Sequence, residues 1–287
     1  MLALLFDILY CRIYLLFSGL KATTYTYAES LIGRHELDVY LPDKKATPAP
    51  VIVFLLGGGW ELGSRKNFQS GILSQIKRGF AVVGVSYSFS QQAAWPTQLH
   101  EVKAAIRWLR ARAEELHLDT NCIILWGISA GGHIASVVGA SNELSAQEGT
   151  LGQYLAQSSE VHAVVAWYPP TDFTQTDDLN AISKRGFYRA TKKLLRATSS
   201  DYTLKAQAAN PISYINKATP PFFIQHGSWD QIVPEKQSRL LYDALKHADI
   251  YVEYERLSGY VHADLRFNNS RNLTKVNAFL DKIVGEN

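Results

Sequence analysis

The sequence predicts an α/β fold with a mostly parallel central sheet, helices on both faces and a small cap insertion. Apolar, β-branched runs at residues 51–56 and 81–85 have the composition of strands that are buried on both faces. Such runs alternate along the chain with helical patterns. The clearest is residues 98–116, where apolar side chains recur on one face. Helices between successive strands act as crossovers, which make neighbouring strands parallel.

Composition favours one domain and excludes several classes of protein. The chain has 287 residues, of which 47% are hydrophobic, and its formal net charge is +3. No linker or repeat divides it, so we expect one domain at residues 25–287 after an apolar segment at residues 1–24. Lys and Arg are spread along the chain, and no nucleic-acid partner is expected. Cys11 and Cys122 make no disulfide framework, and no Cys/His cluster has metal-ligand spacing, so neither metal nor cofactor is expected.

Residues 1–20 are strongly apolar but are interrupted by Asp7 and Arg12. These charges argue against a signal peptide and against a spanning helix. Two interpretations remain, a helix packed on the domain and a helix at a membrane interface. We favour the packed helix, so membrane contact through residues 1–20 stays open without being favoured, and we expect a cytoplasmic protein. The sequence does not indicate an oligomeric state.

The other elements follow in chain order. We expect an edge strand at 35–40, a strand at 51–56, a helix at 67–78, a strand at 81–85, a helix at 98–116, a strand at 122–125, a helix from 133, strands at 161–167 and 222–226, a helix at 237–248 and a strand at 251–257. Between 171 and 211 the pattern weakens to one short basic helix at 187–195. An excursion of this size between core strands is typically a cap over a site, and a surface insertion without a role is the alternative.

Ser129 lies at the centre of a G-x-S-x-G spacing formed with Gly127 and Gly131, between an apolar strand and a small-residue helix. A serine at such a sharp turn needs neighbours without Cβ atoms, because strand and helix approach closely. The pattern predicts a nucleophile whose following helix directs N–H groups at a developing oxyanion. Taken alone, the motif also fits a glycine-rich turn without chemistry.

A serine nucleophile needs a base and an orienting acid. Of the eight histidines, His262 lies in a loop past the last strand, where a base can be presented, whereas His226 ends a strand directly before a glycine and receives no role. Asp230 follows the strand at 222–226, and Asp172 is the competing acid. The G-x-S-x-G motif is known as the nucleophile elbow, and the chain order that it predicts for the three residues is the order found here: Ser129, Asp230, His262.

The oxyanion donors are expected in two places. One is the N–H of Ala130, and the others are Gly58 and Gly59, where unhindered backbone can approach a substrate. Three aromatic residues flank these motifs and either line a pocket or pack around the loops: Trp60, Tyr168 and Trp229.

These motifs resemble those of a known family. They are Leu-Asp-Val-Tyr-Leu-Pro at 37–42, Gly-Gly-Gly-Trp at 57–60, residues 102–110, 126–133 and 210–214, and the His-Gly-Ser-Trp-Asp stretch within 226–234. The chain resembles α/β-hydrolases of the carboxylesterase kind, related to the hormone-sensitive-lipase-like group and closer to the feruloyl-esterase-like family, over roughly 37–266. One departure is Leu56, where the family usually has a loop-bracing His, so the rigidity of the oxyanion loop is in question.

The resemblance implies a serine hydrolase of carboxylic esters that uses a small-molecule ester and no cofactor. We expect short-acyl or aryl esters, because residues 171–211 are short for a lipase lid and carry many Lys and Arg. Two alternatives stay open. An amidase or formamidase would use the same triad, and a non-catalytic small-molecule receptor is less favoured because all three triad residues are present.

Overall fold

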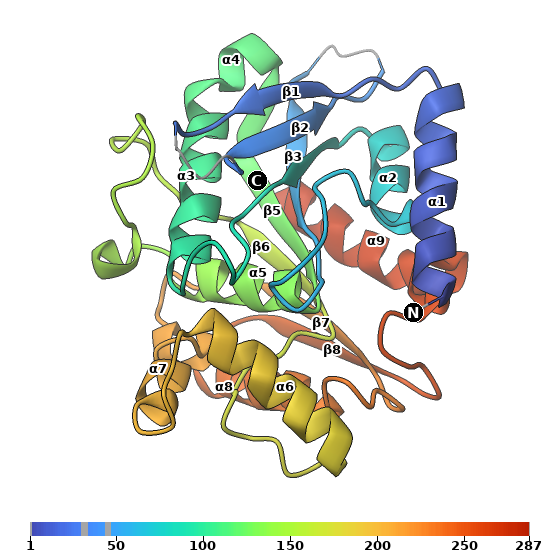
Figure 1. Ribbon diagram of the computed structural model, residues 1–287. Coiled ribbons are helices and arrows are strands. Elements are labelled where there is room, and N and C mark those ends of the chain that lie inside the picture. Colours follow the sequence, from blue (N-terminus) through green and yellow to red (C-terminus); the bar gives the residue numbers. More distant parts are fainter. Residues whose placement is uncertain (1, 30–33, 44–46, 287) are drawn as a thin grey trace.

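The computed structural model describes residues 2–29, 34–43 and 47–286 (Figure 1). Its sheet has the strand order β1-β2-β4-β3-β5-β6-β7-β8 within these residues. Strands β1 and β2 pair antiparallel, as do β2 and β4, and all other pairs are parallel. The strands are β1 Thr23–Thr26, β2 Glu36–Tyr40, β3 Ala49–Leu55, β4 Ala81–Val85, β5 Leu118–Ile128, β6 Ala163–Trp167, β7 Phe222–Gly227 and β8 Val252–Leu257. The predicted α/β fold is confirmed.

Helices cover both faces of the sheet, and each face has its own core. Helices α3 (Thr97–Ala111), α5 (Ala130–Ala140) and α8 (Glu235–His247) pack on one face, and α1 (Leu2–Phe17), α2 (Ser70–Leu73) and α9 (Ser270–Glu286) on the other (Figure 1). In β3, Val51 and Val53 belong to the first core, whereas Ile52 and Phe54 belong to the second. The alternation of side chains along a strand therefore explains why the apolar run is continuous.

The expected helix at 67–78 is shorter and divided. It begins at Ser70 as α2 and continues as the 3₁₀ helix η1, Ser74–Arg78. The side-chain amide of Gln75 donates to the Gly71 carbonyl. In a continuous α-helix this carbonyl would accept the backbone N–H of Gln75 instead. A side-chain contact of this kind cannot be read from hydrophobic periodicity.

Other boundaries also differ from the expected ones. The helix expected at 98–116 ends at Ala111 and resumes as α4, Ala113–Leu116. The basic helix expected at 187–195 is α6, Ala181–Leu194, and it starts earlier because the Asn180 side chain accepts the Ser183 N–H at 3.0 Å. Strand β1 and helix α9 were not among the expected elements.

Helix α1 packs against α2 through a partly buried polar contact. The Asp7 carboxylate accepts hydrogen bonds from the Ser70 N–H at 3.1 Å and from the Ser70 hydroxyl at 2.7 Å. One turn further, Cys11 is buried, and burial together with the nearby Asp7 charge raises the pKa of its thiol to about 12. Among the described residues, no helix has both the length and the apolar composition to cross a membrane.

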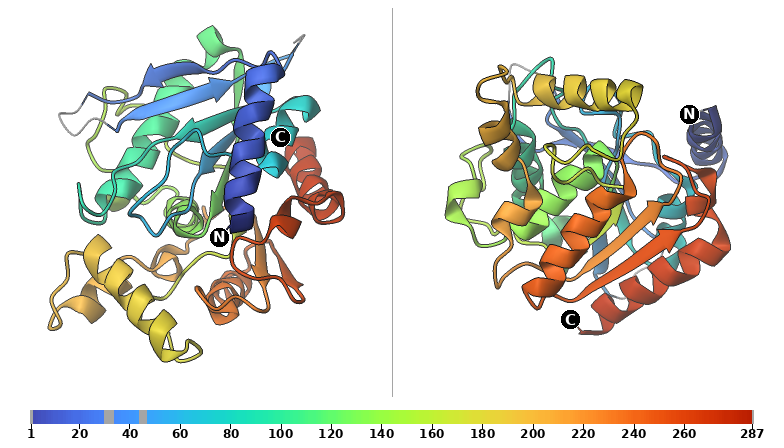
Figure 2. Two further views of the ribbon diagram at one scale, coloured as in Figure 1. Left: turned by 45° about the vertical axis from the view of Figure 1, so that its right-hand side comes forward. Right: turned by 90° about the horizontal axis from the view of Figure 1, so that it is seen from below.

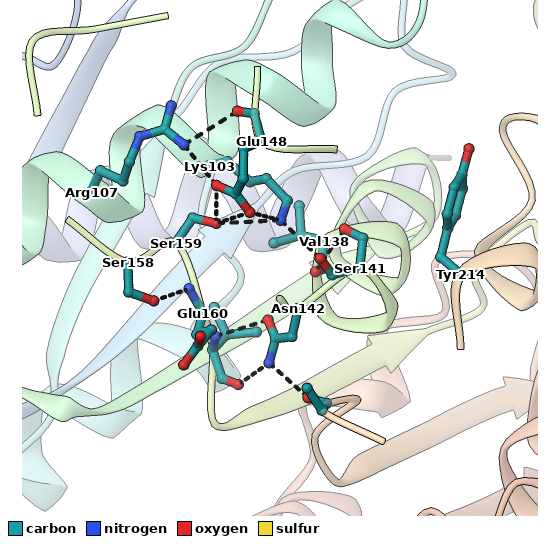
Figure 3. A network of polar contacts seen from close by, with 12 residues as sticks. Lys103, Arg107, Val138, Ser141, Asn142, Glu148, Ser158, Ser159, Glu160 and Tyr214 are labelled. Carbon is teal, nitrogen blue, oxygen red and sulfur yellow. Dashed lines mark hydrogen bonds and ion pairs between the residues drawn. The ribbon is translucent and has the colours of Figure 1, made fainter. Parts of the chain in front are cut away.

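The elbow helix α5 is fixed at its far end by a polar network (Figure 3). Lys103 and Arg107 of α3 are buried and form ion pairs with Glu148 at 2.7 and 2.9 Å. Burial lowers the pKa of Lys103, although its hydrogen bond and ion pair with Glu148 act in the opposite direction. The Lys103 ammonium also donates to the carbonyl of Ser141, directly after α5. The network therefore ties α3 and α5 to the loop that carries Glu148.

The segment between β6 and β7 lies across the end of the sheet where the parallel strands finish (Figures 1 and 2). It contains α6, α7 (Tyr202–Gln207) and the 3₁₀ helix η3 (Pro211–Tyr214). His133 of α5 connects this segment to the sheet domain, because its Nε2 contacts the Ala209 carbonyl at 2.7 Å. The ring is completely buried, which lowers the pKa of His133 to about 4 and favours the neutral form. Loops from the strand ends meet beneath α6, as is typical of ligand sites in parallel sheets.

Candidate active site

Ser129 lies in the turn between β5 and α5 with strained backbone angles, φ 51° and ψ −121°. Both flanking glycines are required because neighbouring backbone lies too close to leave room for a Cβ atom. A Cβ on Gly127 would lie 2.2 Å from the Gly131 carbonyl oxygen, and a Cβ on Gly131 would lie 2.0 Å from that of Leu55. The strain holds the serine side chain at the apex of the turn, above the end of the sheet.

The structure brings together the three residues that the sequence singled out for a triad. His262 Nε2 lies 2.9 Å from Ser129 Oγ, and His262 Nδ1 lies 2.6 Å from Asp230 Oδ2. A carboxylate can only accept, so Nδ1 carries the proton and Nε2 of the neutral ring accepts the serine hydroxyl. The Tyr168 ring packs edge-on against the imidazole, with centroids 4.7 Å apart. The arrangement can remove a proton from Ser129 and stabilise the resulting imidazolium.

Asp230 is buried in the loop after β7 and is strongly hydrogen-bonded. Its Oδ1 accepts the backbone N–H groups of Ile232 and Val233, both at 2.9 Å. Burial acts to raise the pKa of Asp230, but the charge of His262 and hydrogen bonds from His226 and His262 outweigh it and hold this pKa well below its usual range. The carboxylate is therefore ionised at neutral pH.

The competing acid has a different role in the structure. The Asp172 carboxylate accepts the backbone N–H of Thr174 at 2.9 Å and the Thr174 hydroxyl at 2.6 Å. This pattern is a local side-chain turn in the loop after β6. The geometry thus favours Asp230 as the partner of His262.

The residues expected to donate to the oxyanion line the same cavity as Ser129. Ala130 is the first residue of α5, so its N–H has no acceptor within the helix. Gly58 has φ 124°, and a Cβ there would lie 2.1 Å from the Leu62 carbonyl oxygen, so only glycine fits. Gly59 follows with φ 60°. The Leu56 carbonyl accepts the Tyr87 hydroxyl at 2.6 Å, which braces this loop where the family usually has a histidine.

A cavity of about 650 Å³ opens at Ser129 and is lined mainly by apolar side chains. Trp60 and Tyr168 contribute to its wall, as one of the two interpretations of these aromatic residues expected, whereas Trp229 is 66% exposed. Helix α6 presents one face to the cavity and α1 presents Ile8. The α6 residues that line it are Ser183, Gly186, Phe187 and Ala190. Their spacing of three and four residues is that of a single helix face.

Sequence reasoning assigns no functional role to Ile8 or His226, and within the expected cap it does not identify the face of α6 that borders the cavity. Ile8 and the α6 face line the cavity together, although they lie in segments that are distant in the chain, so no local sequence pattern indicates it. The available signal for α6 was its spacing of small and apolar residues, and for His226 its position at the end of a core strand. Within the described part of the chain, no group of three or more His, Cys, Asp or Glu side chains is arranged to hold a metal ion.

The fold and the strand-end serine place the chain in the class of α/β-hydrolase carboxylesterases. Comparison with known families narrows this assignment. Residues 37–245 match the model of the BD-FAE family, and the chain belongs to that family.

Individual relatives agree with this assignment. Esterase LipQ of Mycobacterium tuberculosis is 30% identical over 218 residues, which cover 75% of this chain and 50% of LipQ. The chain spans about half the length of the curated relatives it matches. A truncated carbohydrate esterase from gut microbiota superposes with a TM-score of 0.81 at 27% identity, covering 92% of this chain and 96% of that one. The butyrate-bound esterase Est2 of Thermogutta terrifontis gives 0.73 at 26% identity, covering 91% and 94%.

Proposed function

We propose that the protein is a serine hydrolase that cleaves carboxylic esters, with Ser129, His262 and Asp230 as its catalytic triad. The observation that carries this proposal is the continuous hydrogen-bonded chain from Ser129 Oγ through His262 to Asp230, at 2.9 and 2.6 Å. At its serine end, this series of hydrogen bonds borders a mainly apolar cavity of about 650 Å³, which is within the range of small-molecule sites. Membership of the BD-FAE family and the esterase relatives support the same reaction.

The proposed reaction has two halves. Ser129 Oγ attacks the ester carbonyl while its proton passes to His262 Nε2, and Asp230 stabilises the imidazolium. The N–H groups of Ala130, Gly58 and Gly59 bind the oxyanion, and loss of one such donor typically costs about 3–4 kcal/mol of transition-state stabilisation. The tetrahedral intermediate expels the alcohol, which takes the proton from His262 and leaves an acyl-serine. Water then attacks the acyl-serine with His262 as base, which releases the acid and restores the serine.

We infer that the substrates are short-acyl or aryl esters and that residues 171–211 act as a cap. The apolar face of α6 borders the cavity, whereas its cations Lys184, Arg185 and Arg189 are exposed to water. Est2 has been observed with butyrate and with propionate bound, and this fits a preference for short acyl groups. Each methylene transferred from water to an apolar pocket contributes about 0.8 kcal/mol, but only where the pocket has room for it.

The test is kcat/KM for p-nitrophenyl esters from acetyl to palmitoyl, below and above the micellar limit. We expect a maximum between acetyl and butyryl, a decline by octanoyl and no increase in rate at the micellar threshold. Ser129→Ala gives the background rate. A maximum at decanoyl or longer, or a jump at the threshold, would make the protein a lipase. Turnover of N-formylkynurenine in parallel decides between ester and amide hydrolysis.

A further inference from the structure

His226 is a completely buried imidazole next to the proposed triad. It belongs to β7, and its side chain lies between Asp230 and the first turns of α8. Its Nδ1 contacts Ser238 Oγ at 2.7 Å. Its Nε2 contacts the Val233 carbonyl oxygen at 2.9 Å and Asp230 Oδ2 at 3.2 Å. Each ring nitrogen therefore has a partner within the protein.

These partners determine where the proton of the ring is. The Val233 carbonyl and the Asp230 carboxylate are both acceptors, so Nε2 must carry the hydrogen and share it between them. Nδ1 of the neutral ring then accepts the hydroxyl of Ser238. The ring has no exposed surface, so in the native protein bulk water does not compete for this hydrogen bond.

The Asp230 carboxylate is consequently held on both oxygens. Oδ1 accepts the N–H groups of Ile232 and Val233, while Oδ2 faces the imidazoles of both His226 and His262. Donors on every side leave the carboxylate a single orientation. They also divide its negative charge between two rings, only one of which is in contact with Ser129.

We propose that His226 is a positioning residue that fixes Asp230 toward His262 and limits the negative charge that Asp230 presents to it. The inference rests on the proposed function, because it assigns His226 a part in the triad. His226 does not touch the substrate cavity and acts only through Asp230.

A change in the pH dependence of catalysis follows. The titratable groups that face the carboxylate and its partner ring are His226 from β7, His262 from the loop after β8, and Tyr168 from the loop after β6; α8 contributes the neutral Ser238. Without the His226 donor, more of the Asp230 charge acts on the Nδ1–H of His262. The imidazolium becomes more stable, so the base is lost by protonation at a higher pH.

The experiment compares His226→Asn with His226→Gln. An Asn amide reaches the position of Nδ1, near Ser238, whereas a Gln amide reaches that of Nε2 and can still donate to Asp230. We expect His226→Asn to lower kcat by about 10- to 100-fold, the range for a hydrogen bond to a charged group, with KM unchanged. Its kcat/KM profile should lose activity on the acid side at a pH about half a unit or more higher. His226→Gln should restore most of both, and exposed His247→Asn is the control.

Two results would overturn the inference. One is that Asn and Gln variants of equal melting temperature lose the same activity. The other is that His226→Asn keeps the wild-type kcat and pH profile while Ser129→Ala is inactive. An active Ser129→Ala would instead refute the proposed function on which the inference rests.

If the Asn variant does not fold, the tautomer of His226 in the wild-type protein still tests the inference. With ¹⁵N-labelled histidine, His226 must carry its proton on Nε2 and none on Nδ1 throughout the active pH range. A proton on Nδ1 of His226 in that range would refute the inference.

Discussion

Asp230→Asn should remove most of the activity and leave the fold intact. An asparagine has one carbonyl oxygen in place of two carboxylate oxygens, and the structure determines where that oxygen goes. The Oδ1 position receives two backbone N–H donors, from Ile232 and Val233. An amide NH₂ at this position would face both fixed backbone donors. At the Oδ2 position it would face the His226 N–H, which the Val233 carbonyl also accepts, so the amide oxygen takes the Oδ1 position. The NH₂ group is then directed at His262.

The size of the effect follows from this orientation. The new NH₂ can only donate to His262 Nδ1, which must therefore give up its proton and become an acceptor. The proton moves to Nε2, the nitrogen that lies 2.9 Å from Ser129 Oγ in the native protein. A ring in this tautomer cannot accept the serine proton. In Ser-His-Asp enzymes the same substitution lowers kcat by about 10⁴, or about 5 kcal/mol of activation free energy.

The assay is kcat on p-nitrophenyl butyrate, with Asp172→Asn as the matched control. Asp172 accepts hydrogen bonds only from Thr174 among the contacts of its carboxylate in the described structure, so this variant should stay close to wild type. The reasoning fails if Asp230→Asn retains activity within about tenfold of wild type. It also fails if Asp172→Asn loses as much activity as Asp230→Asn.

Three further substitutions test the cavity, helix α1 and the polar network. Gly186 lies in α6 with open space around it, so Gly186→Leu should exclude about two methylenes of an acyl chain at ~0.8 kcal/mol each; kcat/KM for butyryl relative to acetyl esters then falls about 15-fold, whereas Gly285→Leu, equally open but in α9, leaves the ratio unchanged. Asp7→Ala removes the acceptor that holds α1 on α2 and should cost about 1–3 kcal/mol in thermal unfolding, while an unchanged melting temperature would contradict this docking. Glu148→Gln leaves buried Lys103 without its ion pair and should cost about 3–5 kcal/mol in urea unfolding; a loss below about 1 kcal/mol would contradict the network.

The central strands were predictable because their side chains are buried in hydrophobic cores on both faces of the sheet. In β3 the side chains of Val53 and Phe54 belong to opposite faces, so both positions must be apolar and the run is continuous. The proposed triad was predictable for a similar reason. Ser129, Asp230 and His262 each follow a strand, and the ends of parallel strands meet at one edge of the sheet.

Features that depend on side chains from distant segments were not predictable. The wall of the cavity includes Ile8 of α1 and one face of α6, and no local pattern indicates that both helices line the same cavity. The division of the expected 67–78 helix into α2 and a 3₁₀ helix involves the Gln75 side chain. His226 has the appearance of an ordinary strand residue until its contacts with Asp230 and Ser238 are seen. Periodicity identifies which face of an element is buried but not the partner that covers it.

The central claim is that Ser129 is a nucleophile activated by His262, and covalent labelling tests it most directly. The protein is treated with a fluorophosphonate probe, digested and analysed by mass spectrometry, with hydrolysis of p-nitrophenyl butyrate followed in parallel. The proposed function predicts one adduct per chain, on Ser129, and loss of hydrolysis in proportion to labelling. Folded Ser129→Ala should neither label nor hydrolyse the ester. An adduct on another residue, or full hydrolysis by Ser129→Ala, would contradict the claim.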